Sequence, residues 1–290
     1  IERIDAASLD ILEEVGVVFR DDIALEDWRK AGADVCGERV HLDRGLVKSL
    51  IKTIPSEITL HARNPEKTVA LGGRQSIFIP MTGAPYLRDL EDVRRSPTLD
   101  DLATFHKLAH MLPAMHSSAH HIVEPMDHPI SHRHLRITHS SMLYSDKTFM
   151  GMTTSGQNAE DVLDMCAILF GEEYLETHAV VTGNCNGNSP LVWDETMLSA
   201  MRAFNRRNQP VLCSPFVLGG ANTPASTVPT VAQLNAEALS ALAYTQVIRP
   251  GCPAIYGHYL STVSMQSGAP MAGTPETVSY THLTLPTKVT

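Results

Sequence analysis

The residues best suited to chemistry lie in five loops that are rich in amides, hydroxyls and glycines and poor in charge. These loops are the segments 120–124, 184–190, 214–224, 256–259 and 266–270. The sequence contains no G-x-S-x-G nucleophile elbow and no phosphate-binding P-loop. Amides, small residues and a few aromatic rings suit a small polar ligand that is held by hydrogen bonds and cation–π contacts. We therefore predict a binding site of this kind rather than a nucleophilic triad.

Fourteen histidines raise the alternative of a metal site. His120 and His121 end a strand-like run, and with His258 they could serve a metal-dependent barrel hydrolase. His132 and His134 fall where we expect a helix, which would point their rings in different directions. Hydrogen-bonded or surface histidine is the simpler interpretation of most of these residues. The metal-dependent hydrolase remains an alternative hypothesis.

Composition and charge exclude several classes of protein. The net charge is −9 and the isoelectric point is near 5.8, whereas nucleic-acid binding needs clustered Lys and Arg. The five cysteines are scattered without a C-x-x-C pair, which favours reduced thiols and a cytoplasmic protein. The longest apolar helical stretch, 231–248, contains Gln233, Asn235 and Glu237, which argues against a membrane span. We predict neither a nucleic-acid partner nor a membrane partner.

A helical and small-strand region is predicted for residues 1–97. Three amphipathic helices open it, the first ending at Gly16 and the second at Gly32. Short alternating runs follow, including 58–61 and 77–79, and turn signals separate them. These runs predict small antiparallel strands.

From residue 98 onward, strand-like and helical segments alternate at a spacing of roughly thirty residues, which predicts an α/β fold with a parallel sheet. Strands are predicted at 115–123, 148–152, 178–182, 210–213 and 254–256, with helices at 98–112, 130–143, 157–170, 194–208 and 231–248. No G-x-G-x-x-G follows the first strand, which removes the commonest reason to expect a dinucleotide-binding sheet. We predict a (β/α)8 TIM-type barrel, incomplete in this chain, over residues 98–276.

The segment 277–290 (TVSYTHLTLPTKVT) breaks the preceding pattern with a Thr-rich run that starts no plausible helix. We predict a non-native, adaptor-like tail, with a natural disordered terminus as the alternative. The chain is then expected to be a fragment.

Four motifs carry a resemblance to a known family. They are TGNCNGNSPLVWD (182–194), PVLCSPFVLGGANTPAST (210–227), QLNAEALSALAYTQVIRPGCPAIYG (233–257) and SMQSGAPMAGTPE (264–276). Together they resemble the trimethylamine methyltransferase family, and the resemblance covers about residues 1–276. The combined pattern is specific, although each short motif alone is weak.

The resemblance implies a methyltransferase that moves a methyl group from a methylated amine to the cobalt of a cognate corrinoid protein. The amine is either trimethylamine or a quaternary amine such as glycine betaine. No cofactor binds directly, because the corrinoid (cobalamin) is carried by the partner, and the full-length protein is expected to be a homo-oligomer. A non-catalytic scaffold that binds the amine or docks the corrinoid protein is a further alternative.

The resemblance also suggests roles for individual residues, each beside a structural alternative such as turn geometry, packing or helix capping. Candidate substrate-binding residues are Asn184, Asn186, Asn188, Phe216, Tyr256, His258 and Glu276. Candidate residues for the approach of the corrinoid are Gly219, Gly220, Gln266 and Gly268. Some family members carry pyrrolysine downstream of a position equivalent to Glu276, so the catalytic residue and the identity of the amine stay open. The GGANTP run also differs from the GATAP-like form of typical members.

Overall fold

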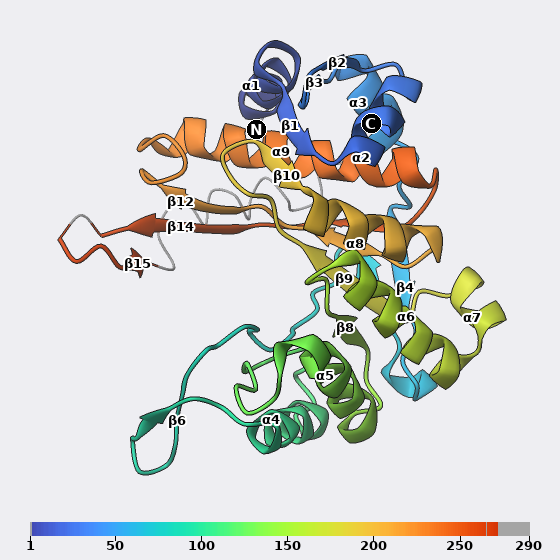
Figure 1. Ribbon diagram of the computed structural model, residues 1–290, viewed down its shortest axis with the longest axis vertical. Helices are drawn as coiled ribbons and strands as arrows, with labels where there is room; N and C mark the ends of the chain where they lie inside the picture. The colour runs from blue at the N-terminus through green and yellow to red at the C-terminus, as the bar shows by residue number, and fades with distance from the viewer. Residues whose placement is uncertain (1, 265, 272–290) are drawn as a thin grey trace.

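The centre of the fold is a parallel sheet of four strands whose spatial order follows the chain (Figure 1). The computed structural model describes residues 2–264 and 266–271. The strands are β8 (Phe149–Gly151), β9 (Val181–Cys185), β11 (Val211–Cys213) and β13 (Ala254–Tyr256). In register, Gly183 lies opposite Gly151 on one side and Val211 on the other. The predicted α/β class is confirmed, and so are three of these strands; the strand predicted at 178–182 begins only at Val181 and runs to Cys185.

The predicted strand at 115–123 is wrong in its extent. The segment lies beside β8, but it forms only isolated bridges, between Ser117 and Thr148 and between Val123 and Ala84. The backbone nitrogen of Met150 donates to the carbonyl oxygen of Ala119 at 3.2 Å, so the segment still follows the edge of the sheet. Ala119 has a φ of 55°, which breaks the extended conformation that a regular ladder needs.

Helices precede, connect or follow these strands. They are α4 (Leu99–Met111), α5 (Ile130–Tyr144), α6 (Gly156–Phe170), α7 (Glu172–Thr177), α8 (Glu195–Arg206) and α9 (Thr227–Ile248). Three of them, α4, α6 and α8, begin at a capping side chain. Thr98 and Asp101 form a capping box at α4, and the side chain of Asp194 accepts from the Met197 nitrogen at α8. Such caps satisfy backbone N–H groups that have no partner inside the helix.

One face of the sheet packs against helix α8. Gly151 and Gly183 lie under the ring of Phe204, where an added Cβ would come within 2.8 Å and 3.1 Å of ring atoms. Cys185 continues the same face, and its Sγ lies 3.7 Å from the carbonyl oxygen of Met197. Because successive side chains in a strand alternate, Thr182 and Asn184 project from the opposite face.

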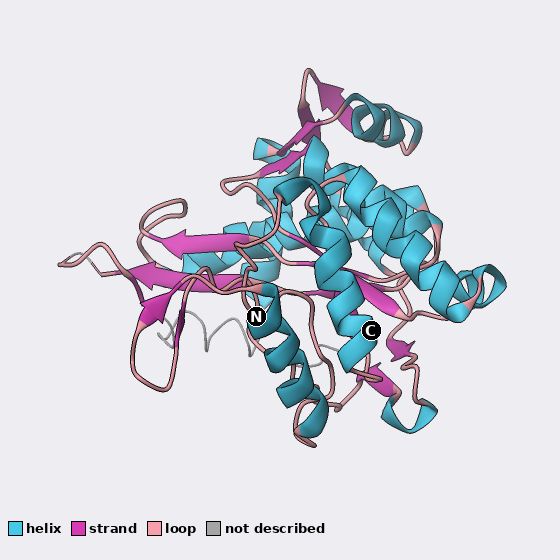
Figure 2. Cartoon of the chain, turned by 60° about the horizontal axis from the view of Figure 1, so that its bottom comes forward, coloured by secondary structure: helices cyan, strands magenta, loops and turns pink. Residues whose placement is uncertain are grey.

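A second sheet extends from the carboxyl ends of β11 and β13. Its strands are β12 (Phe216–Gly219), β14 (Tyr259–Val263) and β15 (Pro270–Met271), with β12 and β14 parallel. In Figure 2 this ribbon reaches away from the helices. The sequence predicted loops here, because such short runs follow directly after buried strands.

The N-terminal region packs across the outer side of α9, as Figure 1 shows. Its helices are α1 (Glu2–Asp10), the π-helix η1 (Ile11–Val15), α2 (Asp22–Lys30) and α3 (Arg44–Ile51), which confirms the three predicted helices. Its strands are β1 (Val17–Arg20), β2 (Asp34–Cys36) and β3 (Arg39–His41), which were not predicted. Strand β1 also pairs in parallel with β10 (Val192–Asp194), so the N-terminal sheet includes a strand from the second predicted domain.

A buried ion pair fixes this region to the parallel-sheet region. Both guanidinium NH groups of Arg202 on α8 donate to the carboxylate of Asp21, at 2.9 and 2.6 Å. The hydroxyl of Tyr244 on α9 lies 3.1 Å from Arg202 and from Asp27. Removal of one partner of such a pair leaves an uncompensated buried charge, which typically costs about 3–5 kcal/mol.

Small antiparallel hairpins follow α3. Strands β4 (Glu57–Leu60) and β5 (Val69–Gly72) flank the 3-10 helix η2 (Pro65–Lys67), and β6 (Leu87–Arg88) pairs with β7 (Arg94–Arg95). The predicted strand at 77–79 is wrong, because these residues form no regular ladder. The backbone nitrogen of Phe78 instead donates to the ring of His116 at 3.0 Å. Among the described residues, no helix is long and apolar enough to cross a membrane.

Candidate functional site at the carboxyl edge of the sheet

Uncharged polar side chains meet at the carboxyl edge of the parallel sheet. The Ser214 hydroxyl, directly after β11, lies 2.9 Å from Asn186 Oδ1 and 3.2 Å from Asn184 Oδ1. The Thr153 hydroxyl, two residues after β8, donates to the carbonyl oxygen of Asn184. We call Thr153, Asn184, Asn186 and Ser214 the amide cluster. The carboxyl edge is where parallel sheets usually place their ligands.

The loop after β9 carries the other predicted asparagine. Asn188 Nδ2 donates to Asp194 Oδ2 at 2.8 Å, and the Asn188 backbone nitrogen donates to the carbonyl oxygen of Val192. These bonds close the loop upon itself. Asn186 and Asn188 are both exposed, so the amide of Asn186 is accessible to a ligand.

The predicted aromatic residues divide between two places. Phe216 stacks on Tyr259 with the ring centroids 4.6 Å apart, and each side chain is 39% exposed. Tyr256 instead donates its hydroxyl to Asn235 Oδ1 on α9. This contact directs Tyr256 toward the helix, on the side of the sheet opposite Ser214. Its predicted contact with a ligand stays a prediction.

The remaining candidates lie just beyond β13 and along the β12–β14 ribbon. His258 follows β13, and burial lowers the pKa of its imidazole to about 4, so the ring is neutral at pH 7. Gly219 lies opposite Thr262, and an added Cβ would be 3.2 Å from the Thr262 methyl group. Gly220 has a φ of +84°, which favours glycine.

Gln266 and Gly268 are exposed at the tip that leads into β15. The structure does not join them to the amide cluster by any hydrogen bond among its described residues. Glu276 and the segment 277–290 lie outside the described residues. The predictions for these positions stay predictions.

The histidine pair of the alternative hypothesis lies in the edge segment 115–123, where His120 is buried and His121 is half-buried. The rings of His120 and His121 stack with centroids 4.1 Å apart, and their Nδ1 atoms are in contact. Burial and the neighbouring imidazoles hold the pKa of His120 well below its usual range. His106 Nε2 lies 2.7 Å from the His120 carbonyl oxygen. In the described ranges, no three His, Cys, Asp or Glu side chains are grouped so that they could hold a metal ion.

Two polar residues of this region were not singled out from the sequence as site residues. Thr153 lies two positions beyond a predicted strand, and that position is a signal that could have found it. Glu237 is the only charged residue in the sequence of α9, and it is 1% exposed. No pattern in the sequence indicates that this carboxylate contacts Ser189 and Leu191, which lie more than forty residues earlier in the chain.

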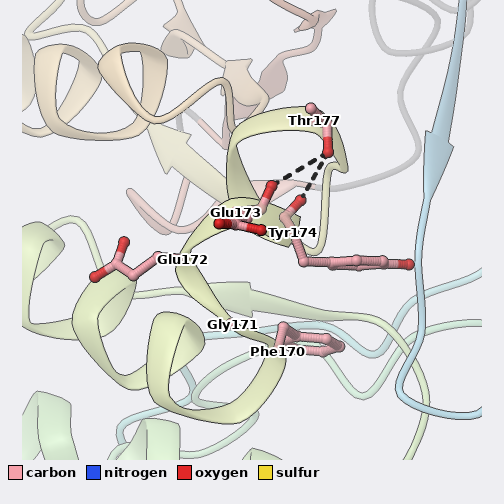
Figure 3. A pocket seen from close by; sticks show the side chains of 6 residues that line it. All are labelled: Phe170, Gly171, Glu172, Glu173, Tyr174 and Thr177. Atoms are coloured by element: carbon pink, nitrogen blue, oxygen red, sulfur yellow. Dashed lines mark hydrogen bonds between the residues drawn. The ribbon is translucent and has the colours of Figure 1, made fainter.

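A separate hollow of about 540 Å³ lies where α6 meets α7, lined by Phe170, Gly171, Glu172, Glu173, Tyr174 and Thr177. Figure 3 shows the rings of Phe170 and Tyr174 one above the other, and their centroids are 6.2 Å apart. Thr177 precedes β9, so the hollow belongs to the amino end of the sheet. It is distinct from the amide cluster.

Comparison with known proteins shows the family. The family model described as trimethylamine methyltransferase (MTTB) matches residues 1–285. The chain therefore belongs to the trimethylamine methyltransferase family, which confirms the resemblance. The match enters the segment 277–290, whose predicted foreign origin stays a prediction.

Individual relatives are also similar over nearly the whole chain. A glycine betaine methyltransferase of Desulfitobacterium hafniense (strain Y51) is 40% identical over 277 residues. A proline betaine:corrinoid methyltransferase of Eubacterium limosum is 28% identical over 289 residues. Each alignment covers 95% of this chain and 58% of the relative, so the chain spans little more than half the length of these proteins.

A solved structure supports the fold. The monomethylamine methyltransferase of Methanosarcina barkeri superposes with a TM-score of 0.60 at 12% identity. The superposition covers 91% of this chain and 53% of that one. At this level of identity the likeness shows the fold alone.

Proposed function

We propose that the full-length gene product transfers a methyl group from a methylated amine to the cobalt of a cognate corrinoid protein. The observation that carries this proposal is the uncharged amide cluster at the carboxyl edge, in a chain of this family. A relative named for glycine betaine is 40% identical to this chain. A quaternary amine of the betaine type is therefore the substrate class we favour over trimethylamine.

For this reaction the main task of the protein is to orient the substrate. The partner's reduced corrinoid supplies the electron pair that forms the new cobalt–carbon bond. The C–N bond breaks, its electron pair stays on nitrogen, and a neutral tertiary amine leaves without any required proton transfer. An amide-rich edge that holds the amine in line and excludes water suits this reaction, since orientation can supply about 7–11 kcal/mol.

The neutral side chains at the edge support a cationic substrate. Asn184, Asn186 and Ser214 present no positive charge to a quaternary ammonium, and burial keeps His258 neutral. The stacked pair of Phe216 and Tyr259 offers exposed aromatic faces nearby. Aromatic faces attract quaternary ammonium groups through their quadrupoles.

The architecture and partners of the whole protein belong to the same proposal. The four sequential parallel strands are proposed as part of a (β/α)8 barrel in a cytoplasmic enzyme. No directly bound cofactor is required in this scheme, since the corrinoid arrives on its partner. The candidates for the surface that the corrinoid approaches are Gly219, Gly220, Gln266 and Gly268.

A homo-oligomer is proposed from the exposed apolar arm around the β6–β7 hairpin. Phe78, Met81, Leu90 and Val93 are each more than half exposed, which is unusual for a monomer surface. Light scattering of the full-length gene product should report an oligomer. Leu90→Glu should shift it toward a smaller species, and a monomeric wild type would contradict the proposal.

The test of function is a methyl-transfer assay. The full-length gene product is mixed with reduced corrinoid protein and one amine at a time, and the absorbance change from cob(I)alamin to methylcobalamin is followed. Glycine betaine should support methylation of cobalt. Failure with glycine betaine, proline betaine, carnitine and trimethylamine would contradict the proposed function.

A further inference from the structure

A buried polar pair on α9 contacts both loops that border the amide cluster. Gln233 and Glu237 are one helical turn apart, and Gln233 Nε2 donates to Glu237 Oε1 at 2.9 Å. Their exposed fractions are 8% and 1%. A carboxylate is rarely buried to this extent unless its oxygens accept several hydrogen bonds.

Glu237 accepts its other hydrogen bonds from the loop after β9. The Ser189 hydroxyl donates to Oε2 at 2.5 Å, and the backbone nitrogen of Leu191 donates to Oε1 at 2.9 Å. Gly187 lies on the same side, where an added Cβ would be 3.6 Å from Oε2. The carboxylate thus holds the loop at Ser189 and Leu191, which lie three and five residues beyond Asn186.

Gln233 reaches the loop that follows β12. Its Nε2 also lies 3.2 Å from the carbonyl oxygen of Asn222. Asn222 in turn accepts from the Leu218 nitrogen at 2.6 Å and donates to the Phe216 carbonyl oxygen at 3.2 Å. One side of α9 is therefore connected by hydrogen bonds to both polar loops.

We infer that Gln233 and Glu237 form a positioning pair that fixes the loop of Asn186 and Asn188 against the β12 loop, and so sets the shape of the amine site. The inference rests on the proposed function. Neither residue needs to touch the amine. They act by holding Asn186, whose amide oxygen meets the Ser214 hydroxyl across the site.

A purely structural role is the competing explanation, and the chain offers a matched control. Gln209 is a fully buried polar residue at the amino end of the sheet. Its Oε1 accepts from the Val180 nitrogen at 2.8 Å, and its Nε2 donates to the Leu175 carbonyl oxygen at 2.7 Å. Gln209→Met removes buried hydrogen bonds comparable to those that Glu237→Met removes. It does so at the amino end of the sheet, whereas the amide cluster lies at the carboxyl end.

The test compares Glu237→Gln, Glu237→Met and Gln209→Met in the full-length gene product. Melting temperature and KM for glycine betaine are measured in the corrinoid-methylation assay. Glu237→Gln keeps an oxygen that accepts from Leu191 and Gln233. The Ser189 hydroxyl oxygen can accept a hydrogen bond from the new amide NH2 group, so KM should stay within about twofold of the wild-type value. Glu237→Met should raise KM about tenfold or more, because a loop displaced by an ångström misplaces the amide. Gln209→Met should lower the melting temperature and leave KM unchanged.

An unchanged KM in Glu237→Met, or an equal rise in Gln209→Met, would overturn the inference while the proposed function stands. An equal loss in Glu237→Gln and Glu237→Met would also overturn it, since charge rather than loop geometry would then matter. If Glu237→Met does not fold, Ser189→Ala removes only the loop-side donor and should still raise KM. A wild type that is inactive with every amine would overturn the proposed function, and the inference with it.

Discussion

The two ends of the parallel sheet are built on different principles. At the amino end, the β4–β5 hairpin packs Ile58 and Leu60 against Ala179, and the His61 nitrogen donates to the Ala179 carbonyl oxygen at 2.7 Å. At the carboxyl end, the amide cluster faces loops that leave Asn186 exposed. Figure 1 shows β4 on one side of the sheet and the β12–β14 ribbon on the other. The hairpin packs apolar side chains at the amino end and supports stability there, whereas the carboxyl end leaves a polar side chain exposed and suits ligand binding.

The largest expected effect tests the amino end alone. Gln209→Met should lower the free energy of unfolding by about 3 kcal/mol, because the Val180 nitrogen and the Leu175 carbonyl oxygen lose a buried partner. Urea denaturation measures the loss. Asn208→Gly, at a neighbouring residue whose side chain makes an exposed bond to the Glu176 carbonyl oxygen and whose φ of 57° suits glycine, is the control and should change stability by less than about 1 kcal/mol.

The next effect concerns pH at the carboxyl end. The pKa of His258 is about 4 in the folded protein against an ordinary value of 6.5. Between these values the unfolded chain binds a proton that the folded protein does not, so stability falls as the pH drops from 6.5 to about 4. One such histidine contributes about 2 kcal/mol to that loss. Thermal melts of His258→Gln should show a shallower decline, whereas exposed His132→Gln should follow the wild type.

A smaller change in free energy is expected from the amide cluster itself. Ser214→Ala removes the hydroxyl that meets Asn184 and Asn186, so the amides lose their fixed orientation. We expect kcat/KM for glycine betaine to fall about tenfold, which corresponds to about 1.4 kcal/mol. Steady-state methyl transfer measures it, with Ser199→Ala on α8 as the control. The free energy of unfolding of Ser214→Ala in urea should fall by no more than about 1 kcal/mol, and a larger loss of stability would contradict a binding role.

The smallest expected effect is on stability and concerns Thr182, which lies on β9 together with Asn184 of the amide cluster. The hydroxyl of Thr182 is buried without a hydrogen-bond partner in the described structure. Thr182→Val should therefore leave stability unchanged or raise it by up to about 1 kcal/mol. Thermal denaturation decides the sign, and a clear loss of stability would show that this hydroxyl is satisfied in solution.

Local patterns predicted the parallel sheet well, but pairing over long distances could not be predicted. The runs around β8, β9, β11 and β13 carry their own apolar pattern, and βα alternation leaves few topologies. The pairing of Val18 with Val192 has no local signature, because each short strand becomes regular only beside its partner. The β12–β14 ribbon was missed for the same reason.

The candidate site was predicted in part. The asparagines after β9 were found because polar residues at a strand end are informative. The direction of Tyr256 could not be predicted, since a shift of one residue moves a side chain to the other face of a strand. Glu237 entered the sequence argument only as evidence against a membrane span. Its partners, Ser189 and Leu191, lie more than forty residues earlier in the chain.

The pairing of β1 with β10 also has a consequence for synthesis of the protein. Strand β1 leaves the ribosome early, but its parallel partner β10 exists only after residue 192 has been made. The Asp21 carboxylate likewise gains its ion-pair partner only after Arg202 has been made. The N-terminal segment cannot complete these contacts until residues 192–202 have been made, and until then it stays accessible to chaperones and proteases.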